Sequence, residues 1–355
     1  MHRSLAALVT VVVVAALTSV AAVGAAQAQE AADGGAEWTL PRTPDGQPDM
    51  QGYWTTQTFT PVERPERLAD QEFFSDEELA LLQRQLTAEG VDPLRRDAVE
   101  IGDPNVREEA LYQENREASY VHYDNQVWLR TPVPKGLSSR RTSLITYPRN
   151  GRFPPMTPQG AARVAHERAM RNVFDGYETR PLMERCIIWA HEGPPMLPPA
   201  YNDIHQIFQT PDHIVLFTEI GTGLPRIIPL DDRPHLPETV RQFGGSSRAR
   251  WEGDTLVVES KNFIARRNYR GSNQFRHVVE RFTRVAEDTI RYEVTVDDPT
   301  TWTSRWSAEV PMIRTEGPMY EYGCHEGNHD IRHILEINRN LERQAAEAAA
   351  AAASR

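Results

Sequence analysis

The sequence lacks the motifs on which several large enzyme classes depend. It contains no G-x-S-x-G nucleophile motif, no phosphate-binding loop, no dinucleotide-binding fingerprint and no C-x-x-C-H haem-attachment motif. We therefore expect no redox cofactor. Only two of the 39 basic residues are lysines, Lys135 and Lys261, and the net charge is -11. Such an acidic chain offers no broad basic surface, so we do not expect nucleic acid or anionic lipid as a partner.

Long apolar runs are absent except near the N-terminus. Leu5 to Val23 contains no charged residue, Arg3 precedes this run, and Ala26-Gln27-Ala28 follows it. This is the three-part pattern of a secretory signal peptide with an A-x-A cleavage site. A membrane anchor is the alternative, but the run has no basic stop-transfer flank. We expect residues 1–28 to be a signal peptide and the mature protein to be periplasmic or secreted, without membrane insertion.

Cysteine is scarce, since the chain has only Cys186 and Cys324. In an oxidising compartment an isolated pair favours a disulfide over two free thiols. The alternative is a nucleophilic Cys324 beside His325, which would require a thiol kept reduced in that compartment.

The composition of the chain changes near residue 186. Residues 29–185 are rich in proline, arginine, glutamate and glutamine and contain two helical stretches, Ser75 to Gln85 and Thr157 to Val173, each opened by an N-capping residue. Residues 186–328 have a β pattern. Residues 329–355 predict a C-terminal helix and an alanine-rich tail, which we expect to be frayed.

Short β-type runs dominate the region 186–328. They are separated by tight-turn sequences such as Thr210-Pro211-Asp212 and Glu252-Gly253-Asp254, which favour consecutive antiparallel hairpins. The runs are Ile204 to Gln209, His213 to Glu219, Arg226 to Leu230, Arg248 to Trp251, Thr255 to Ser260, His277 to Val285, Thr289 to Val296, Trp306 to Ile313 and Met319 to Tyr322.

A meander of this size removes its exposed edges most simply by closing into a barrel. The predicted fold is thus mainly β: an antiparallel up-and-down barrel, preceded by a mixed helical and extended region and followed by a helix. Cys186 precedes the first run and Cys324 follows the last. Because the first and last strands of such a barrel are neighbours, the disulfide would fasten its closure.

Several longer motifs carry a family resemblance across nearly the whole mature chain. They are Pro41 to Gly52, Arg141 to Ile145, Arg226 to Asp231, Arg233 to Leu236, Arg250 to Glu259, Val279 to Arg284 and Tyr320 to Asn328. Together they resemble a large family of secreted bacterial proteins, mostly labelled hypothetical. The expected barrel also looks like a lipocalin-type or calycin-type barrel, which implies a small apolar molecule held at the barrel mouth. Some calycin-like secreted proteins are instead hydratases or isomerases, and fold alone does not decide function.

The segment from His325 to His329 fits the H-E-x-x-H pattern, in which two histidines bind zinc and the glutamate acts as general base. Gly327 and Asn328 are poor residues for the interior of the helix that this pattern requires. The alternative is that His329 is a surface histidine and that no metal is bound.

Without a metal, His325, Glu326 and Glu219 are candidate proton carriers. His325 would lie beside the closing strand, and a histidine titrates near neutral pH. Glu219 shares a strand face with Val215 and Phe217, so we expect it to point into the barrel with a raised pKa. For His325, a purely structural role is an equally strong alternative.

Other polar and aromatic side chains are candidate ligand contacts. Arg276 and Glu280 alternate onto one strand face and form either a buried or a solvated ion pair; the solvated pair is favoured. The candidate contacts are Tyr201, Asn202, His205, Gln206, Arg226, His235, Trp251, Arg276 and Tyr292.

The leading functional hypothesis is a periplasmic enzyme that acts on a small apolar or aromatic molecule by cofactor-free acid/base chemistry, as a lyase, hydratase or isomerase. A carrier or sensor that only binds such a molecule is the second hypothesis. A zinc hydrolase that uses His325 and His329 is the third.

Overall fold

The structure is a computed structural model that describes residues 38–86, 136–198, 204–219, 221, 224–266 and 268–354. The chain divides into two units, Met1–Thr39 and Leu40–Arg355, and every element named below belongs to the second. The predicted signal peptide, residues 1–28, and the candidates Tyr201 and Asn202 lie outside the described residues.

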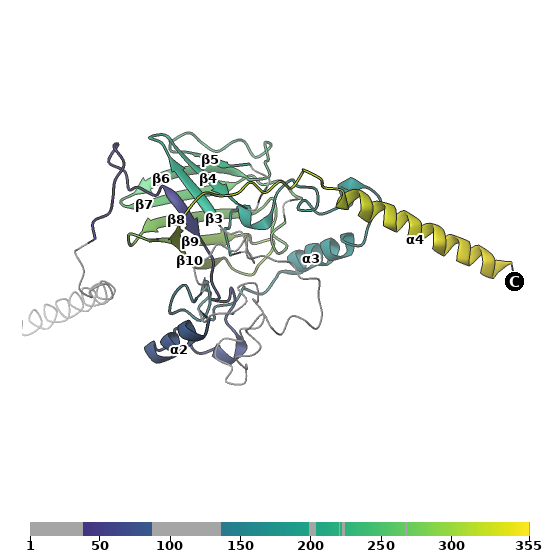
Figure 1. The fold of residues 1–355 in the computed structure, drawn as a ribbon, viewed down its shortest axis with the longest axis horizontal. Coiled ribbons are helices and arrows are strands. Elements are labelled where there is room, and N and C mark those ends of the chain that lie inside the picture. The colour runs from purple at the N-terminus through teal and green to yellow at the C-terminus, as the bar shows by residue number, and fades with distance from the viewer. Residues whose placement is uncertain are drawn as a thin grey trace, which may run out of the picture. The chain divides into compact units, whose positions relative to one another are not determined.

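One antiparallel sheet of ten strands organises the described residues, in the order β5-β4-β3-β1-β10-β9-β8-β7-β6, with β2 also paired to β10. β5 and β6 stand at the two ends of this order and contact each other without a paired ladder, so the sheet is a nearly closed barrel (Figure 1). The strands are β1 Gly52–Thr55, β2 Ile145–Tyr147, β3 Ile204–Gln209, β4 His213–Thr218, β5 Arg226–Pro229, β6 Ser246–Glu252, β7 Thr255–Lys261, β8 His277–Arg284, β9 Thr289–Asp297 and β10 Trp306–Thr315.

The predicted hairpins are confirmed for β3 to β5 and for β6 to β10. Strands consecutive in the chain pair with each other within each of these two groups. The turn between β6 and β7 contains Gly253 at φ +60°, a left-handed conformation that glycine adopts without steric cost. The mainly β antiparallel barrel expected from the sequence is therefore confirmed.

The closure of the barrel differs from the simple meander. β1 lies between β3 and β10, pairing Tyr53 with Gln206 on one side and with Thr315 on the other. Because β1 occupies this edge of β10, the predicted strand Met319 to Tyr322 has no free edge to pair with there and lies outside the sheet. That ninth strand prediction is wrong.

The disulfide between Cys186 and Cys324 is confirmed, with a Cα–Cα distance of 5.7 Å. It joins the segments before β3 and after β10, but β1 separates these two strands, so the disulfide does not fasten neighbouring strands. The open seam lies instead between β5 and β6. Both cysteines of the chain are oxidised, which excludes the nucleophilic thiol at Cys324.

Fully buried side chains fill the barrel interior. Along β8 and β9, each buried residue is followed by a half-buried or exposed one. Val278, Phe282 and Val294 are among the buried residues and point inward. Burying an aliphatic or aromatic side chain of this size contributes about 1.5–3 kcal/mol. Trp302 and Trp306 pack edge to face with a centroid distance of 5.8 Å.

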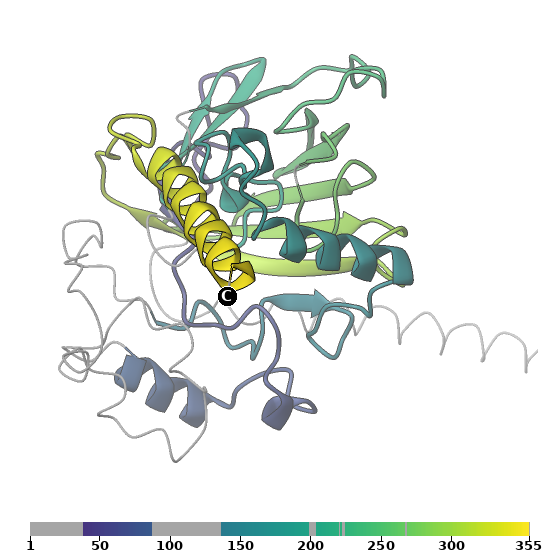
Figure 2. The same ribbon diagram turned by 90° about the vertical axis from the view of Figure 1, so that its right-hand side faces the viewer.

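Helices α2 and α3 begin where the sequence supplies N-caps. Helix α2, Asp76–Leu86, follows Ser75, whose Oγ accepts the N–H of Glu78 at 3.2 Å. Helix α3, Pro158–Met170, lies at one end of the barrel beside the β7–β8 connection (Figure 1, Figure 2). Helix α4, Asp330–Ala353, includes the alanine run that we expected to be frayed; alanine is the strongest helix former. Short 3-10 helices span Glu66–Leu68, Tyr177–Thr179 and Ala190–Glu192.

None of the helices that the structure describes combines the length and apolar character needed to cross a lipid bilayer.

Candidate functional site

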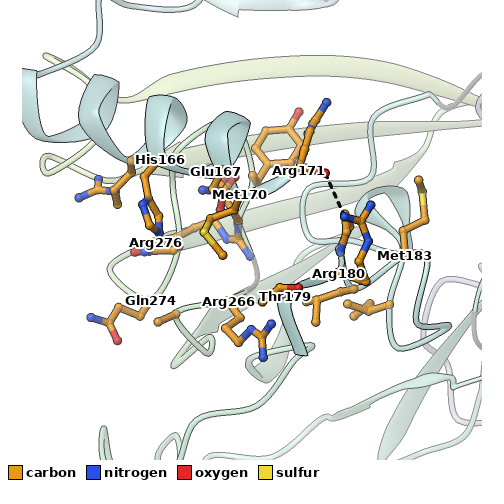
Figure 3. Close-up of a pocket in the computed structure, with 18 of the residues that line it drawn as sticks. His166, Glu167, Met170, Arg171, Thr179, Arg180, Met183, Arg266, Gln274 and Arg276 are labelled. Carbon is orange, nitrogen blue, oxygen red and sulfur yellow. Dashed lines mark hydrogen bonds between the residues drawn. The ribbon is translucent and has the colours of Figure 1, made fainter. Parts of the chain in front are cut away.

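A pocket of about 1050 Å³ lies at one end of the barrel, between α3 and the connection that joins β7 to β8. The segment that follows α3, with Thr179, Arg180 and Met183, forms another part of its wall (Figure 3). Ile188, Trp189 and Pro194 complete the wall. We call it the α3 pocket. Its large apolar lining residues are Met170, Leu182, Met183, Ile188, Trp189 and Phe275. Its charged and histidine lining residues are Arg163, His166, Glu167, Arg171, Glu178, Arg180, Arg266 and Arg276.

Close packing at the first turn of α3 fixes the position of the helix. Thr157 caps the helix, with its Oγ1 accepting the N–H of Gly160 at 3.0 Å, and Pro158 starts it. A β-carbon at Gly160 would lie 2.4 Å from the backbone oxygen of Thr301, so only glycine allows this approach. The same helix then presents Glu167 and Met170 to the pocket.

Two arginines of the wall have structural partners. Arg163 donates to the backbone oxygens of Gly271 at 2.7 Å and of Thr300 at 2.9 Å, which ties α3 to two loops at the barrel end. Arg180 forms a two-point ion pair with Glu184 at 2.9 and 3.1 Å and donates to the backbone oxygen of Arg171. These contacts shape the wall and still leave both side chains charged.

Arg276 differs from these arginines because its buried guanidinium lacks a full set of partners. The residue is 1 % exposed, and within the described chain its Nε and Nη2 find no hydrogen-bond partner. Its Nη1 donates to the backbone oxygen of Ser272 at 3.4 Å, and the guanidinium lies 4.1 Å from the ring centroid of Phe263. Burial lowers the pKa of Arg276 to about 10.

Two acidic groups of the wall have raised pKa values. Partial desolvation raises the pKa of the Glu167 carboxyl, although its side chain still contacts solvent within the pocket. Burial raises the pKa of the Tyr269 hydroxyl to about 12. The Tyr269 ring stacks on Trp306 at a centroid distance of 6.1 Å, which links the pocket floor to the barrel core. Glu167 is therefore the carboxyl of the wall whose pKa is displaced upward, and it lies next to His166 on the same helix.

Three of the predicted ligand contacts lie inside the barrel core instead of the α3 pocket. Arg226 and Glu280 form a two-point ion pair at 2.6 and 3.1 Å, and the Tyr292 hydroxyl donates to Glu280 at 2.9 Å. His205, 1 % exposed, contacts the Thr218 hydroxyl at 3.1 Å, and burial lowers its pKa to about 3.

The pairing expected for Glu280 is corrected. Glu280 is 0 % exposed and pairs with Arg226 of β5, not with Arg276, which directly precedes β8, so no solvated Arg276–Glu280 pair forms. Burial alone would lower the pKa of Arg226, but the charge of Glu280 and its hydrogen bonds raise it. Burial also raises the pKa of Tyr292 well above its ordinary value. Each of these contacts joins two protein groups, so they form a structural network in the barrel core, in which the Nε of Arg226 has no hydrogen-bond partner within the described chain.

The H-E-x-x-H segment lies outside any helix and directly precedes α4. α4 starts at Asp330, and His329 is its N-cap residue. His325, Glu326 and His329 are exposed, and His329 stacks on His333 at a centroid distance of 6.2 Å. The described residues contain no group of three or more histidine, cysteine, aspartate or glutamate side chains placed to hold a metal ion.

Glu219 is buried, but not for the reason expected. The most buried residues of β4 are Ile214, Leu216 and Thr218, so the face of Val215 and Phe217 points outward. Glu219 follows the end of this strand, and its Oε1 accepts the N–H of Tyr320 at 3.3 Å. It does not line the α3 pocket.

The remaining predicted contacts, Gln206, His235 and Trp251, do not line the α3 pocket, and Trp251 packs against the hydrophobic core. Gln206 alternates with His205 and Ile207, both inward-facing, and therefore points outward. His235 contacts the Ser246 hydroxyl at 3.3 Å, and burial lowers its pKa. The Trp251 indole donates to the Gln47 side chain at 2.6 Å. Of the described candidates, only Arg276 lines the α3 pocket.

Sequence reasoning missed His166, Glu167 and Met170 as site residues. It predicted the helix that carries them but assigned no role to its surface. The available signal was their spacing, since residues three and four apart share one side of a helix. The loop that faces them is about 100 residues further along the chain, and no local pattern reveals that contact.

Comparisons of the chain with models of protein families, with curated proteins and with solved structures find no match. The family resemblance therefore stays a prediction from the sequence motifs, and the structure is compatible with the barrel that it implies.

Proposed function

We propose that the protein binds a small, largely apolar organic molecule in the α3 pocket. The observation that carries this proposal is the pocket itself, about 1050 Å³ with a mixed apolar and polar wall. Ligand pockets are typically apolar hollows of about 300–1,000 Å³ with a few well-placed polar groups. The barrel interior is filled by side chains such as Phe282 and Tyr292, so the ligand is held at the barrel end.

We further propose that this ligand is met outside the cytoplasm, in the periplasm or the cell exterior. The Cys186–Cys324 disulfide supports this, because such bonds persist in oxidising compartments. The signal-peptide pattern of residues 1–28 points the same way.

The second candidate function is acid/base catalysis on the bound molecule. Glu167 supports it, because this carboxyl lines the pocket and desolvation raises its pKa toward the range useful for proton transfer. The proton carriers expected from the sequence, His325 and Glu219, do not line this pocket. Any acid/base role in the α3 pocket thus passes to Glu167, with His166 beside it.

Blocking the pocket tests the binding proposal. Ala162 lines the pocket, whereas Ala165 is an exposed residue of the same helix that does not. Equilibrium dialysis would measure the binding of phenylacetate, naphthylacetate and octanoate, and of their neutral amides, to the native protein. We expect Ala162→Trp to abolish binding and Ala165→Trp to preserve it. Failure of the whole panel to bind, or equal binding by both variants, would contradict the proposal.

Catalysis is tested on molecules that copurify with the protein from its native host. These would be incubated with the native protein, with Glu167→Gln and with Glu178→Gln, and conversion would be followed by mass spectrometry. Acid/base catalysis is supported if Glu167→Gln converts the molecule at least about 100-fold more slowly than the native protein does and binds it with unchanged affinity. No conversion by the native protein contradicts it and leaves binding as the function.

A further inference from the structure

The charge of the α3 pocket is opposite to that of the whole protein. Among the described residues that line it are five arginines and two glutamates, whereas the chain has a net charge of -11. Clefts lined by one sign of charge concentrate molecules of the other sign. The wall of the pocket is therefore suited to an anion.

Arg276 gives this positive wall a specific attachment point. It is 1 % exposed and, within the described chain, forms no ion pair with a carboxylate and leaves Nε and Nη2 without hydrogen-bond partners. The nearby carboxylate of Asp298 already accepts from the hydroxyls of Ser272 and Thr301, at 2.8 and 2.7 Å. The charge of Arg276 is thus only partly compensated by the protein.

An uncompensated buried charge opposes folding, and proteins keep such groups mainly where function uses them. Arg276 lines the pocket, and the Oδ1 of Asn273, another lining residue, is also without a hydrogen-bond partner in the described chain. A planar guanidinium recognises a carboxylate through two parallel hydrogen bonds. The Nε and Nη2 of Arg276 are both buried from solvent. A ligand can therefore contact them directly only after a neighbouring side chain of the wall rotates.

We infer that the ligand is an organic carboxylate, an inference that rests on the proposed function. Its anionic group is directed toward Arg276, and its apolar body lies against Met170, Trp189 and Phe275, which line the same pocket. A single buried guanidinium matches one negative charge, so a monoanionic carboxylate fits better than a dianionic phosphonate. An amide of the same shape lacks the charge.

The test compares naphthylacetate with naphthylacetamide by equilibrium dialysis. We expect the acid to bind the native protein about 10- to 100-fold more tightly than the amide, because hydrogen bonds to charged groups are the stronger ones. Arg276→Met should reduce the affinity for the acid to that for the amide and leave amide binding unchanged, which also shows that the pocket is intact. Arg168→Met removes a charge from α3 at a position outside the pocket and should change neither affinity.

The outcomes separate this inference from the proposed function. If acid and amide bind equally, and Ala162→Trp abolishes both, the pocket binds ligands but the carboxylate assignment fails. If naphthylmethylphosphonate binds more tightly than naphthylacetate, the assignment also fails. If none of these probes binds the native protein, the proposed function fails as well.

Discussion

Replacing Arg276 with methionine should stabilise the protein, which is unusual for a buried residue of this size. Burial lowers the pKa of Arg276 from 12.5 to about 10. At 1.36 kcal/mol per pKa unit, keeping this side chain charged in the folded state at pH 7 costs about 3 kcal/mol relative to the unfolded chain. Methionine fills similar space without a charge.

The substitution also removes favourable contacts of the guanidinium. Its position 4.1 Å from the Phe263 ring centroid contributes about 1–2 kcal/mol as a desolvated cation–π contact. The hydrogen bond to the Ser272 oxygen is long at 3.4 Å and adds little. The net expectation for Arg276→Met is a free energy of unfolding about 1–2 kcal/mol higher than that of the native protein.

Urea unfolding at pH 7, followed by tryptophan fluorescence with the disulfide intact, measures this difference. Arg168→Met, on the exposed side of α3, is the control and should change the free energy of unfolding by no more than about 0.5 kcal/mol. An Arg276→Met variant that is no more stable than the native protein would refute the reasoning, because the guanidinium would then be satisfied in the folded state.

Three other predictions concern the barrel core and α3. Arg226→Met leaves the carboxylate of Glu280 buried without its charged partner and should lower the free energy of unfolding by about 3–5 kcal/mol, as urea unfolding would show. NMR titration of the His205 imidazole should give a midpoint near pH 3, and a midpoint near 6.5 would contradict its burial. Because the same side chain titrates near 6.5 in the unfolded chain, the free energy of unfolding should fall as the pH drops from 6.5 toward 3. Gly160→Ala should lower the free energy of unfolding by about 1–3 kcal/mol and weaken ligand binding. Its control is Gly244→Ala, where a β-carbon meets nothing within 4 Å, and this variant should leave thermal unfolding nearly unchanged.

Local patterns were sufficient to predict the hairpins of the barrel. β3 and β4 are joined by the turn at Thr210-Pro211-Asp212 and differ from the predicted runs by at most one residue. β1 was missed because its four residues, Gly52–Thr55, are too short for a clear alternation, and both of its partners are distant in the chain. The pairing of β1 is therefore a tertiary property.

The candidate site depended even more on distant contacts. Alternation along β8 placed Glu280 on the same face as Val278 and Phe282, but its partner Arg226 lies 54 residues earlier on β5. Arg276 was identified as a candidate from the same pattern, yet its pocket is formed by α3, about 100 residues away. A single sequence contains no local signal for which helix covers the end of a barrel.

Methyl NMR offers the most direct test that the α3 pocket is the binding site. Met170 and Met183 line the pocket, whereas Met50 and Met312 are buried in the barrel core. With methionine methyl groups labelled, naphthylacetate would be titrated into the native protein. The account predicts saturable shifts of the Met170 and Met183 signals, with the Met50 and Met312 signals unchanged. Saturable shifts confined to Met50 and Met312, or no saturable shift at Met170 and Met183, would contradict it.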